Sequence, residues 1–242
     1  MDASIVVPSA WHTNPYVLLP PLAYYSLGKV LVGGRLDSAR AWFETTGAAR
    51  WHNAAMAVYS LLVCLHVCSH WASSGPPGVC NAPHPGFPTW VLTTWYWSKM
   101  WEWWDTLILM VRGRTVTRLH GLHHAITASL VALQHGHWQQ PHTPLYEWGT
   151  ALNAGVHTLM YVYYFAPSTF SGVRTFVTFA QTVQHAIMMI LILSSLSYVV
   201  NGQTCVVDES SNLVPALAYL FFLVEFSMLL FASGNPTNSK SK

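Results

Sequence analysis

Long apolar stretches separated by short polar segments follow one another along the whole chain. Each stretch is long enough for a helix of roughly 20 residues, the length that crosses a bilayer. Seven such spans are predicted, at residues 16–32, 52–71, 89–111, 120–138, 144–165, 173–200 and 213–232. The segments 33–50 and 72–88 contain several Gly and polar residues and are predicted as loops. With no repeat or low-complexity linker, residues 1–242 form one domain in this prediction, an all-α integral membrane protein.

The charge pattern strengthens this prediction. Asp, Glu, Lys and Arg make up only 8% of the chain, against about 25% in a typical soluble domain. None of them occurs between residues 50 and 99, 118 and 147, 147 and 174, or 174 and 208. The formal net charge of +2 is too small to indicate a nucleic-acid partner.

Basic residues lie on one side of the predicted membrane. If the C-terminus is cytosolic, the segments 33–50, 112–119, 166–174 and the tail hold nine of the eleven Lys and Arg residues. The segments on the other side (1–15, 72–88, 139–143 and 201–212) hold none. Since cytosolic loops carry the excess of Lys and Arg, we expect a lumenal N-terminus and a cytosolic C-terminus.

The four cysteines form no CxxC motif. Cys64 and Cys68 lie inside a span and are expected to be small apolar residues there. Cys80 and Cys205 both fall on the non-cytosolic side, where conditions are oxidising, so we predict a disulfide between them. Two separate free thiols are the alternative. No residue set is assigned to a metal.

Two groups of ionisable residues interrupt the apolar spans near the middle of the chain. Lys99, Glu102 and Asp105 are spaced to share one face of a helix. His120, His123 and His124 follow within five residues at the start of the fourth span. Ionisable residues inside a membrane are costly and mark functional sites by default.

Two later spans carry polar stripes at the same estimated depth. The fifth span carries Asn153, His157, Tyr161 and Tyr164, and the sixth carries Thr178, Gln181, Gln184 and His185. Polar groups of four helices at one level cannot face lipid cheaply, so we expect them to line a shared interior.

Structural roles remain open for several of these residues. The Lys99, Glu102 and Asp105 group could be a buried ion network. Tyr164 could belong to an aromatic belt at the interface, and the two glutamines could join helices by hydrogen bonds. A structural role is favoured for His66 and His70. Most of the remaining histidines, which lie near surfaces or loops, are expected to be incidental: His12, His52, His84, His135, His137 and His142.

Four motifs resemble those of a known family and occur in the same order along the chain. They read Lys99-x-x-Glu102-x-x-Asp105-Thr106, His120-x-x-His123-His124, Asn153-x-x-x-His157-x-x-Met160-Tyr161-x-Tyr163-Tyr164 and Thr178-x-x-Gln181-x-x-Gln184. Together they resemble the ELO family of very-long-chain fatty acid elongases. The resemblance implies an endoplasmic reticulum enzyme in which spans two to seven form a barrel around a narrow acyl tunnel, with the first span outside. The basic stretch after the first motif is shorter than usual, and the tail lacks dilysine spacing.

The implied activity is the condensation of a long-chain acyl-CoA with malonyl-CoA to 3-ketoacyl-CoA, CO2 and CoA. No cysteine lies at the depth of the polar residues, so histidine is the available nucleophile. The resemblance implies His123 as nucleophile, with His157, His120 and His124 as the other catalytic residues. The orienting or oxyanion-stabilising residues are Lys99, Glu102, Asp105, Asn153, Gln181 and Gln184. The expected substrate-binding residues are Tyr161, Tyr164, Thr178, Arg112, Arg114, Arg118 and Arg174.

The expected partners are the two CoA thioesters and the bilayer, with no further cofactor. A second copy of the chain or other enzymes of the elongation cycle are the candidate protein partners. One alternative is a diiron desaturase or hydroxylase, because HxxHH also occurs in such enzymes and His66-x-x-x-His70 supplies an HxxxH. However, the predicted topology places that pair at the lumenal end. A seven-span transporter or sensor is the other alternative.

Overall fold

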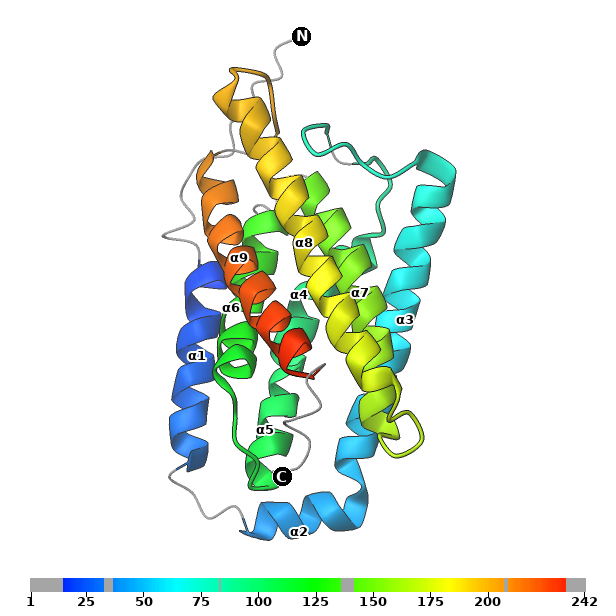
Figure 1. The fold of residues 1–242 in the computed structure, drawn as a ribbon, viewed down its shortest axis with the longest axis vertical. Helices are drawn as coiled ribbons and strands as arrows, with labels where there is room; N and C mark the ends of the chain where they lie inside the picture. The colour runs from blue at the N-terminus through cyan, green and yellow to red at the C-terminus, as the bar shows by residue number, and fades with distance from the viewer. Residues whose placement is uncertain (1–14, 33–36, 83, 136–141, 207–208, 234–242) are drawn as a thin grey trace.

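The computed structural model describes residues 15–32, 37–82, 84–135, 142–206 and 209–233, and every regular element in these ranges is an α-helix. Long helices run roughly parallel to one axis, as Figure 1 shows. Their bounds are α1 Pro15–Val32, α2 Asp37–Thr46, α3 Ala48–Ser74, α4 Thr89–Trp101, α5 Trp103–Val111, α6 Arg118–His135, α7 Pro144–Phe165, α8 Val173–Val200 and α9 Glu209–Ser233.

Six long columns of helix form a closed ring. Around the ring, α3 packs on α7, α7 on α8, α8 on α9, α9 on α6, and α6 on α4, which continues into α5. The ring closes where Val63 and Val67 of α3 meet Val91 and Trp95 of α4. Helix α1 lies outside the ring against α6 (Figure 1). The arrangement agrees with a barrel that leaves the first helix outside.

The two ends of the ring differ in chemistry. At the disulfide end, a disulfide joins Cys80 in the loop after α3 to Cys205 in the loop after α8. This is the disulfide that was predicted from the placement of both cysteines on the non-cytosolic side. The arginine end, opposite, holds Arg112, Arg114, Arg118 and Arg174. The disulfide end lies at the top of Figure 1.

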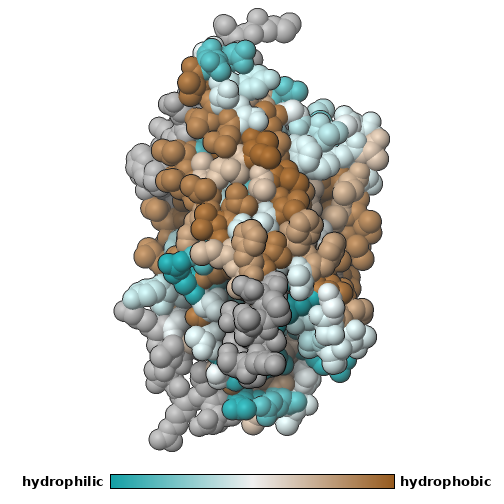
Figure 2. All heavy atoms as spheres, viewed as in Figure 1, coloured by the Kyte–Doolittle hydropathy of each residue, from teal (hydrophilic) through white to brown (hydrophobic). Residues whose placement is uncertain are grey.

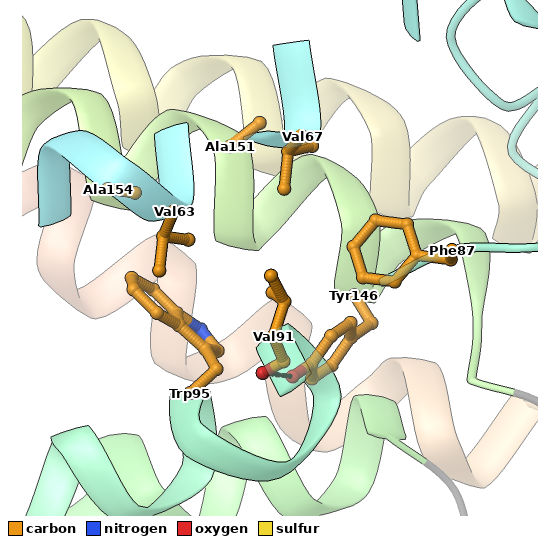
Figure 3. Close-up of a cluster of buried hydrophobic side chains, with 8 residues drawn as sticks. All are labelled: Val63, Val67, Phe87, Val91, Trp95, Tyr146, Ala151 and Ala154. Carbon is orange, nitrogen blue, oxygen red and sulfur yellow. Dashed lines mark hydrogen bonds between the residues drawn. The ribbon is translucent and has the colours of Figure 1, made fainter. Parts of the chain in front are cut away.

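Large side chains fill the interior near the disulfide end (Figure 3). Phe87, Val91 and Trp95 pack there against Tyr146, whose hydroxyl donates to the carbonyl of Val91 at 3.4 Å. Thr143 begins α7 by accepting a hydrogen bond from the amide of Tyr146, and Pro144 occupies the first turn. A capping threonine followed by proline is a strong helix start. This half of the barrel is therefore a packed core.

A helix replaces the loop predicted at residues 33–50. The amphipathic helix α2 crosses the arginine end (Figure 1). Its Phe43 is buried against Ala49, Ile108 and Val111, whereas Trp42 beside it is 52% exposed. The prediction was wrong because charged residues and glycines dominate this segment, and its apolar stripe is short. Such a helix suits the interface between water and lipid.

The predicted helix over 89–111 is interrupted at Glu102, which separates α4 from α5. There the amide of Asp105 donates to the carbonyl of Glu102 at 3.0 Å, a spacing of three residues instead of four. A single face over Lys99, Glu102 and Asp105 was therefore an oversimplified prediction. The local tightening lies within the first polar motif, and short 3₁₀ stretches inside helices often mark functional positions.

Three helices in the described part of the chain are long and apolar enough to cross a membrane, and they lie at Ala48–Ser74, Val173–Val200 and Asn212–Ala232. The other four predicted spans remain predictions. Helices α6 and α7 carry many polar residues, which lowers their hydropathy even though those residues face the interior. Figure 2 shows a broad hydrophobic belt between more hydrophilic ends. Exposed side chains of the belt include Leu61, Leu65, Ile190, Leu193 and Phe231.

Candidate active site

A buried lysine joins two helices at the level of the first motif. The Nζ atom of Lys99, 2% exposed, lies 2.5 Å from Oε1 of Glu102 and 2.8 Å from Oδ1 of Asn153 on α7. The same ammonium lies 4.0 Å from the ring centroid of Trp95. A buried charge is tolerated only when paired and hydrogen-bonded. This network therefore fixes α4 against α7.

Asp105 binds two different helices. Its Oδ1 lies 2.8 Å from Nε2 of His52 on α3, and its Oδ2 accepts a hydrogen bond of 2.6 Å from the hydroxyl of Tyr161 on α7. The interpretation of His52 as incidental was wrong. A usable signal was present, because His52 opens an apolar span at the same end as Asp105.

The three histidines of the HxxHH motif lie together on α6. The rings of His120 and His124 stack with centroids 4.2 Å apart, and those of His123 and His124 are 5.4 Å apart. The ring of His123 packs against Phe222 of α9 at 5.1 Å. Spacings of three and four residues bring side chains together on one helix face, as the sequence predicted.

A hydrogen-bonded chain leads from this cluster to the outer helix. Nε2 of His120 lies 2.9 Å from Oγ1 of Thr106 on α5, which lies 3.0 Å from the hydroxyl of Tyr24 on α1. The indole of Trp103 donates to the carbonyl of His124 at 3.0 Å. Helix α1 thus contacts the site through one tyrosine, although it lies outside the ring.

His157 of α7 lies opposite the HxxHH histidines. Its Nδ1 lies 3.3 Å from Oε1 of Glu102, but the geometry is not that of a hydrogen bond. Its ring contacts Tyr161 edge to face at 5.6 Å. Glu102 therefore lies between Lys99 and His157, where its charge can orient the imidazole.

Most polar side chains of the α8 motif make contacts within the protein. The amide of Gln181 lies 3.7 Å from the sulfur of Met160, and Nδ1 of His185 lies 2.5 Å from the carbonyl of Gln181. The ring of His185 stacks on Phe226 at 5.0 Å. Among the described residues of α8, only Gln184 has a buried side-chain oxygen without a hydrogen-bond partner.

Two cavities meet at His123. The histidine cavity, of about 530 Å³, extends to the exposed residues Arg114 and Arg174 at the arginine end. Residues of four motifs line it: Asp105, His120, His123, His124, His157, Met160, Tyr163, Tyr164, Thr178 and Gln181. The inner cavity, of about 40 Å³, lies beyond His123 and is also lined by Lys99, Asn153, Gln184 and His185.

The inner cavity differs from the expected acyl tunnel. It has room for a few water molecules, and its wall includes polar atoms of Thr127, Gln134, Thr150 and Gln184 that have no hydrogen-bond partner in the described residues. Neither cavity is lined by a described residue of the loops that carry Cys80 and Cys205. An acyl chain on a path from His123 to the disulfide end would have to displace side chains and any water between them.

Of the four arginines predicted to bind substrate, two line the histidine cavity and two do not. Arg114 and Arg174 line the histidine cavity. Gly113 allows the first of these placements, because its φ of 64° turns the chain sharply after α5. Arg118 instead forms an ion pair with Glu225 and lies over the ring of Phe221. Arg112 is exposed and does not line the cavity.

A second cluster, at the disulfide end, was missed in the sequence. Glu147 of α7 is fully buried and receives hydrogen bonds from His84 and His142, which were both predicted to be incidental. His70 lies beside them, whereas His66 points toward Trp90. The HxxxH pair therefore does not join the HxxHH cluster, as the topology predicted. His12 and His137, and the side chain of His135, lie outside the described residues.

Comparisons with known proteins place these motifs in context. A family model described as "ELO: GNS1/SUR4 family" matches residues 10–241. "Putative fatty acid elongase" of Dictyostelium discoideum is 27% identical over 204 residues, which is 78% of this chain and 67% of that protein. "Long chain fatty acid elongase 2" of Caenorhabditis elegans is 28% identical over 162 residues, 61% of this chain and 56% of that protein.

A third relative matches over a shorter region. "Long chain fatty acid elongase 1" of Caenorhabditis elegans is 33% identical over 115 residues, 44% of this chain and 38% of that protein. The chain thus aligns with about two thirds or less of the length of these relatives. No solved structure matches the chain.

Proposed function

We propose that this chain, which belongs to the ELO (GNS1/SUR4) family, condenses a long-chain acyl-CoA with malonyl-CoA to give 3-ketoacyl-CoA, CO2 and CoA. The observation that carries the proposal is the histidine cavity, where His123 of α6 and His157 of α7 face one space that reaches two arginines. The curated relatives named as fatty acid elongases support the same reaction class.

Histidine is the nucleophile in this proposal. Neither free cysteine, Cys64 or Cys68, lines the histidine cavity or the inner cavity in the described residues. An imidazole lone pair is available near neutral pH without prior deprotonation. His123 is the choice among the histidines because it alone of the HxxHH motif lines both cavities.

The first half-reaction transfers the acyl group to His123. The imidazole nitrogen attacks the thioester carbonyl carbon, the C–S bond breaks, and CoA leaves as a thiolate. That thiolate takes the proton from the acyl-imidazolium, so free CoA and a neutral acyl-imidazole result. Lys99 and Asn153, on the inner side of His123, are placed to stabilise negative charge on the carbonyl oxygen.

The second half-reaction forms the carbon–carbon bond. Malonyl-CoA loses CO2, and the electron pair of the broken bond becomes an enolate. The enolate carbon attacks the acyl carbon, the bond from that carbon to imidazole breaks, and the imidazole nitrogen takes one proton from solvent. His157, oriented by Glu102, is placed to hold the malonyl carboxylate or the acyl carbonyl before this step.

The substrates set the orientation of the protein. CoA carries phosphates, and guanidinium groups bind phosphate through charge-assisted hydrogen bonds. Arg114 and Arg174 therefore bind CoA at the arginine end. In this proposal seven spans cross the endoplasmic reticulum membrane, and the arginine end faces the cytosol. The acyl chain enters the barrel beyond His123 and widens the inner cavity as it binds.

Labelled malonyl-CoA and a panel of acyl-CoAs test the reaction in membranes that contain the full chain. The wild type should yield labelled 3-ketoacyl-CoA, His123→Ala should not, and His66→Ala should behave as the wild type. Mass spectrometry after incubation with acyl-CoA alone should find an acyl adduct on α6. Intersecting-line kinetics with no such adduct would exclude the covalent route, and product formation by His123→Ala would exclude His123 as nucleophile.

A further inference from the structure

Glu147 is a buried carboxylate surrounded by imidazoles. It lies in the first turn of α7 and is 0% exposed. Oε1 accepts hydrogen bonds from Nε2 of His142 at 2.9 Å and from the amide of His84 at 3.2 Å. Oε2 lies 3.0 Å from Nδ1 of His84 and accepts from the indole of Trp71 at 3.2 Å. No lysine or arginine pairs with it in the described residues.

The ring of His70 completes this group and makes no hydrogen bond among the described residues. Its Nε2 is buried and has no partner among the described residues, and its ring lies 5.4 Å from that of His84. A buried polar atom with no partner costs free energy unless something binds it. One ligand atom each from His70, His84 and Glu147 lie within 4.8 Å of one another.

We propose that His70, His84 and Glu147 bind one divalent transition-metal ion of the zinc class, a site separate from the histidine cavity. Two imidazole nitrogens and a carboxylate oxygen are a ligand set that zinc favours. Zinc ligands at about 2.1 Å from a tetrahedral ion lie about 3.4 Å apart, so small side-chain rotations suffice to close the site. The fourth position is left to water.

Two further donors complete the site. His142 and Trp71 each donate to an oxygen of Glu147. Hydrogen bonds of this kind orient a metal-binding carboxylate. When the metal binds Nδ1 of His84, the proton of that nitrogen moves to Nε2 of the same ring, so the imidazole remains neutral.

The site joins three segments that are distant in sequence. His70 lies near the end of α3, His84 lies in the loop 75–88, and Glu147 lies in the first turn of α7. The same loop is held by the disulfide between Cys80 and Cys205 and by the indole of Trp148, which donates to the carbonyl of Pro77 at 3.0 Å. A loop already held at two points presents its histidine with little further loss of entropy. The metal therefore clamps the disulfide end of the barrel.

The experiment uses the untagged full chain, purified in detergent and stripped of metal. Zinc titration by calorimetry should show one site per chain, and cobalt should give the visible absorption of a tetrahedral ion. His70→Ala should weaken zinc binding at least 100-fold and abolish the cobalt spectrum. His142→Ala should weaken binding about 10- to 100-fold, and His66→Ala, on the same helix, should bind as the wild type.

His70→Ala is a suitable variant because the removed ring makes no hydrogen bond among the described residues and only contacts the rings of His84 and Phe87 edge to face, so the metal-free protein should lose little of its melting temperature. Zinc should then raise the melting temperature of the wild type and of His66→Ala but not that of His70→Ala. Absence of saturable binding, or equal binding by wild type and His70→Ala, would overturn the proposal. The proposed condensation is tested separately, since His123→Ala should retain the metal.

Discussion

Two histidine-rich sites in the barrel surround a buried carboxylate in different ways. Each contains histidines around a buried carboxylate, at Glu102 near the middle and at Glu147 near the disulfide end. Glu102 is paired with Lys99 and lies 3.3 Å from His157, which lines a cavity of about 530 Å³ that reaches two arginines. Glu147 has no cationic side chain beside it in the described residues and is enclosed by four hydrogen bonds.

In the two proposals above, this difference separates a site of reaction from a metal site that holds a loop. Of the residues that line the cavity, His124 and His157 each have an Nδ1 atom without a hydrogen-bond partner in the described residues. In the proposed reaction these atoms can bind a substrate, and Arg114 and Arg174 at the same cavity can bind its negative charge. At the disulfide end, both oxygens of the carboxylate are already bound. The surroundings of a histidine therefore indicate its role better than its spacing in a motif.

The largest expected effect tests the cavity side of the comparison. His123→Ala should lower the rate of condensation by about 10³-fold or more, because removal of a nucleophile leaves only binding and charge stabilisation. The rate of labelled 3-ketoacyl-CoA formation measures this. His66→Ala, at the other end, should keep the wild-type rate, and a similar loss in both variants would contradict the assignment.

The next effect concerns the buried lysine. Lys99→Ala leaves Glu102 as an uncompensated buried charge beside His157, which should cost about 3–5 kcal/mol of stability. Thermal unfolding in detergent measures the loss. Arg40→Ala is the matched control, because its pair with Glu44 is exposed on α2 and should contribute at most about 1 kcal/mol. Equal melting temperatures for Lys99→Ala and wild type would refute the ion network as a structural element.

The disulfide tests the opposite end. Replacing both Cys80 and Cys205 by Ser should cost about 2–4 kcal/mol, because the bridge closes a long loop. The melting temperature should fall, while the condensation rate at low temperature should stay near wild type because the bridge lies far from His123. A rate loss as large as that of His123→Ala would show that the two ends are coupled.

The smallest effect concerns substrate affinity. Arg174→Ala should raise the KM for acyl-CoA about tenfold with little change in kcat, since one charge-assisted contact to phosphate is lost. Steady-state kinetics at fixed malonyl-CoA measure it. Arg40→Ala, at the same end but on α2, should leave KM unchanged. A fall in kcat with constant KM would instead place Arg174 among the groups that act on the reacting atoms.

Short-range patterns in the sequence were sufficient for much of the fold. Runs of apolar residues predicted the positions of α1, α3, α6, α7, α8 and α9 within about one turn, because helix formation in an apolar chain depends on local composition. Helical spacing predicted that His120, His123 and His124 would meet. The resemblance to the ELO family, based on four short motifs, is confirmed.

Other features depend on contacts between distant segments. One partner of Asp105 is His52, 53 positions earlier, and the carboxylate of Glu147 contacts His84, 63 positions earlier. No local period encodes such pairs. The start of an apolar span indicates the depth of His52, but only the packed helices show that it contacts Asp105. Helix α2 was missed because its apolar stripe is short. The break at Glu102 was missed because it lies inside a continuous predicted span.

The sequence by itself thus determined that this chain is helical, apolar outside and polar at one interior level. Only the tertiary structure decided which histidines face a cavity and which enclose a carboxylate. The physical reason is that hydropathy acts residue by residue, whereas hydrogen bonds and ion pairs need two groups within about 3 Å of each other. That proximity arises here only when the ring of helices has closed.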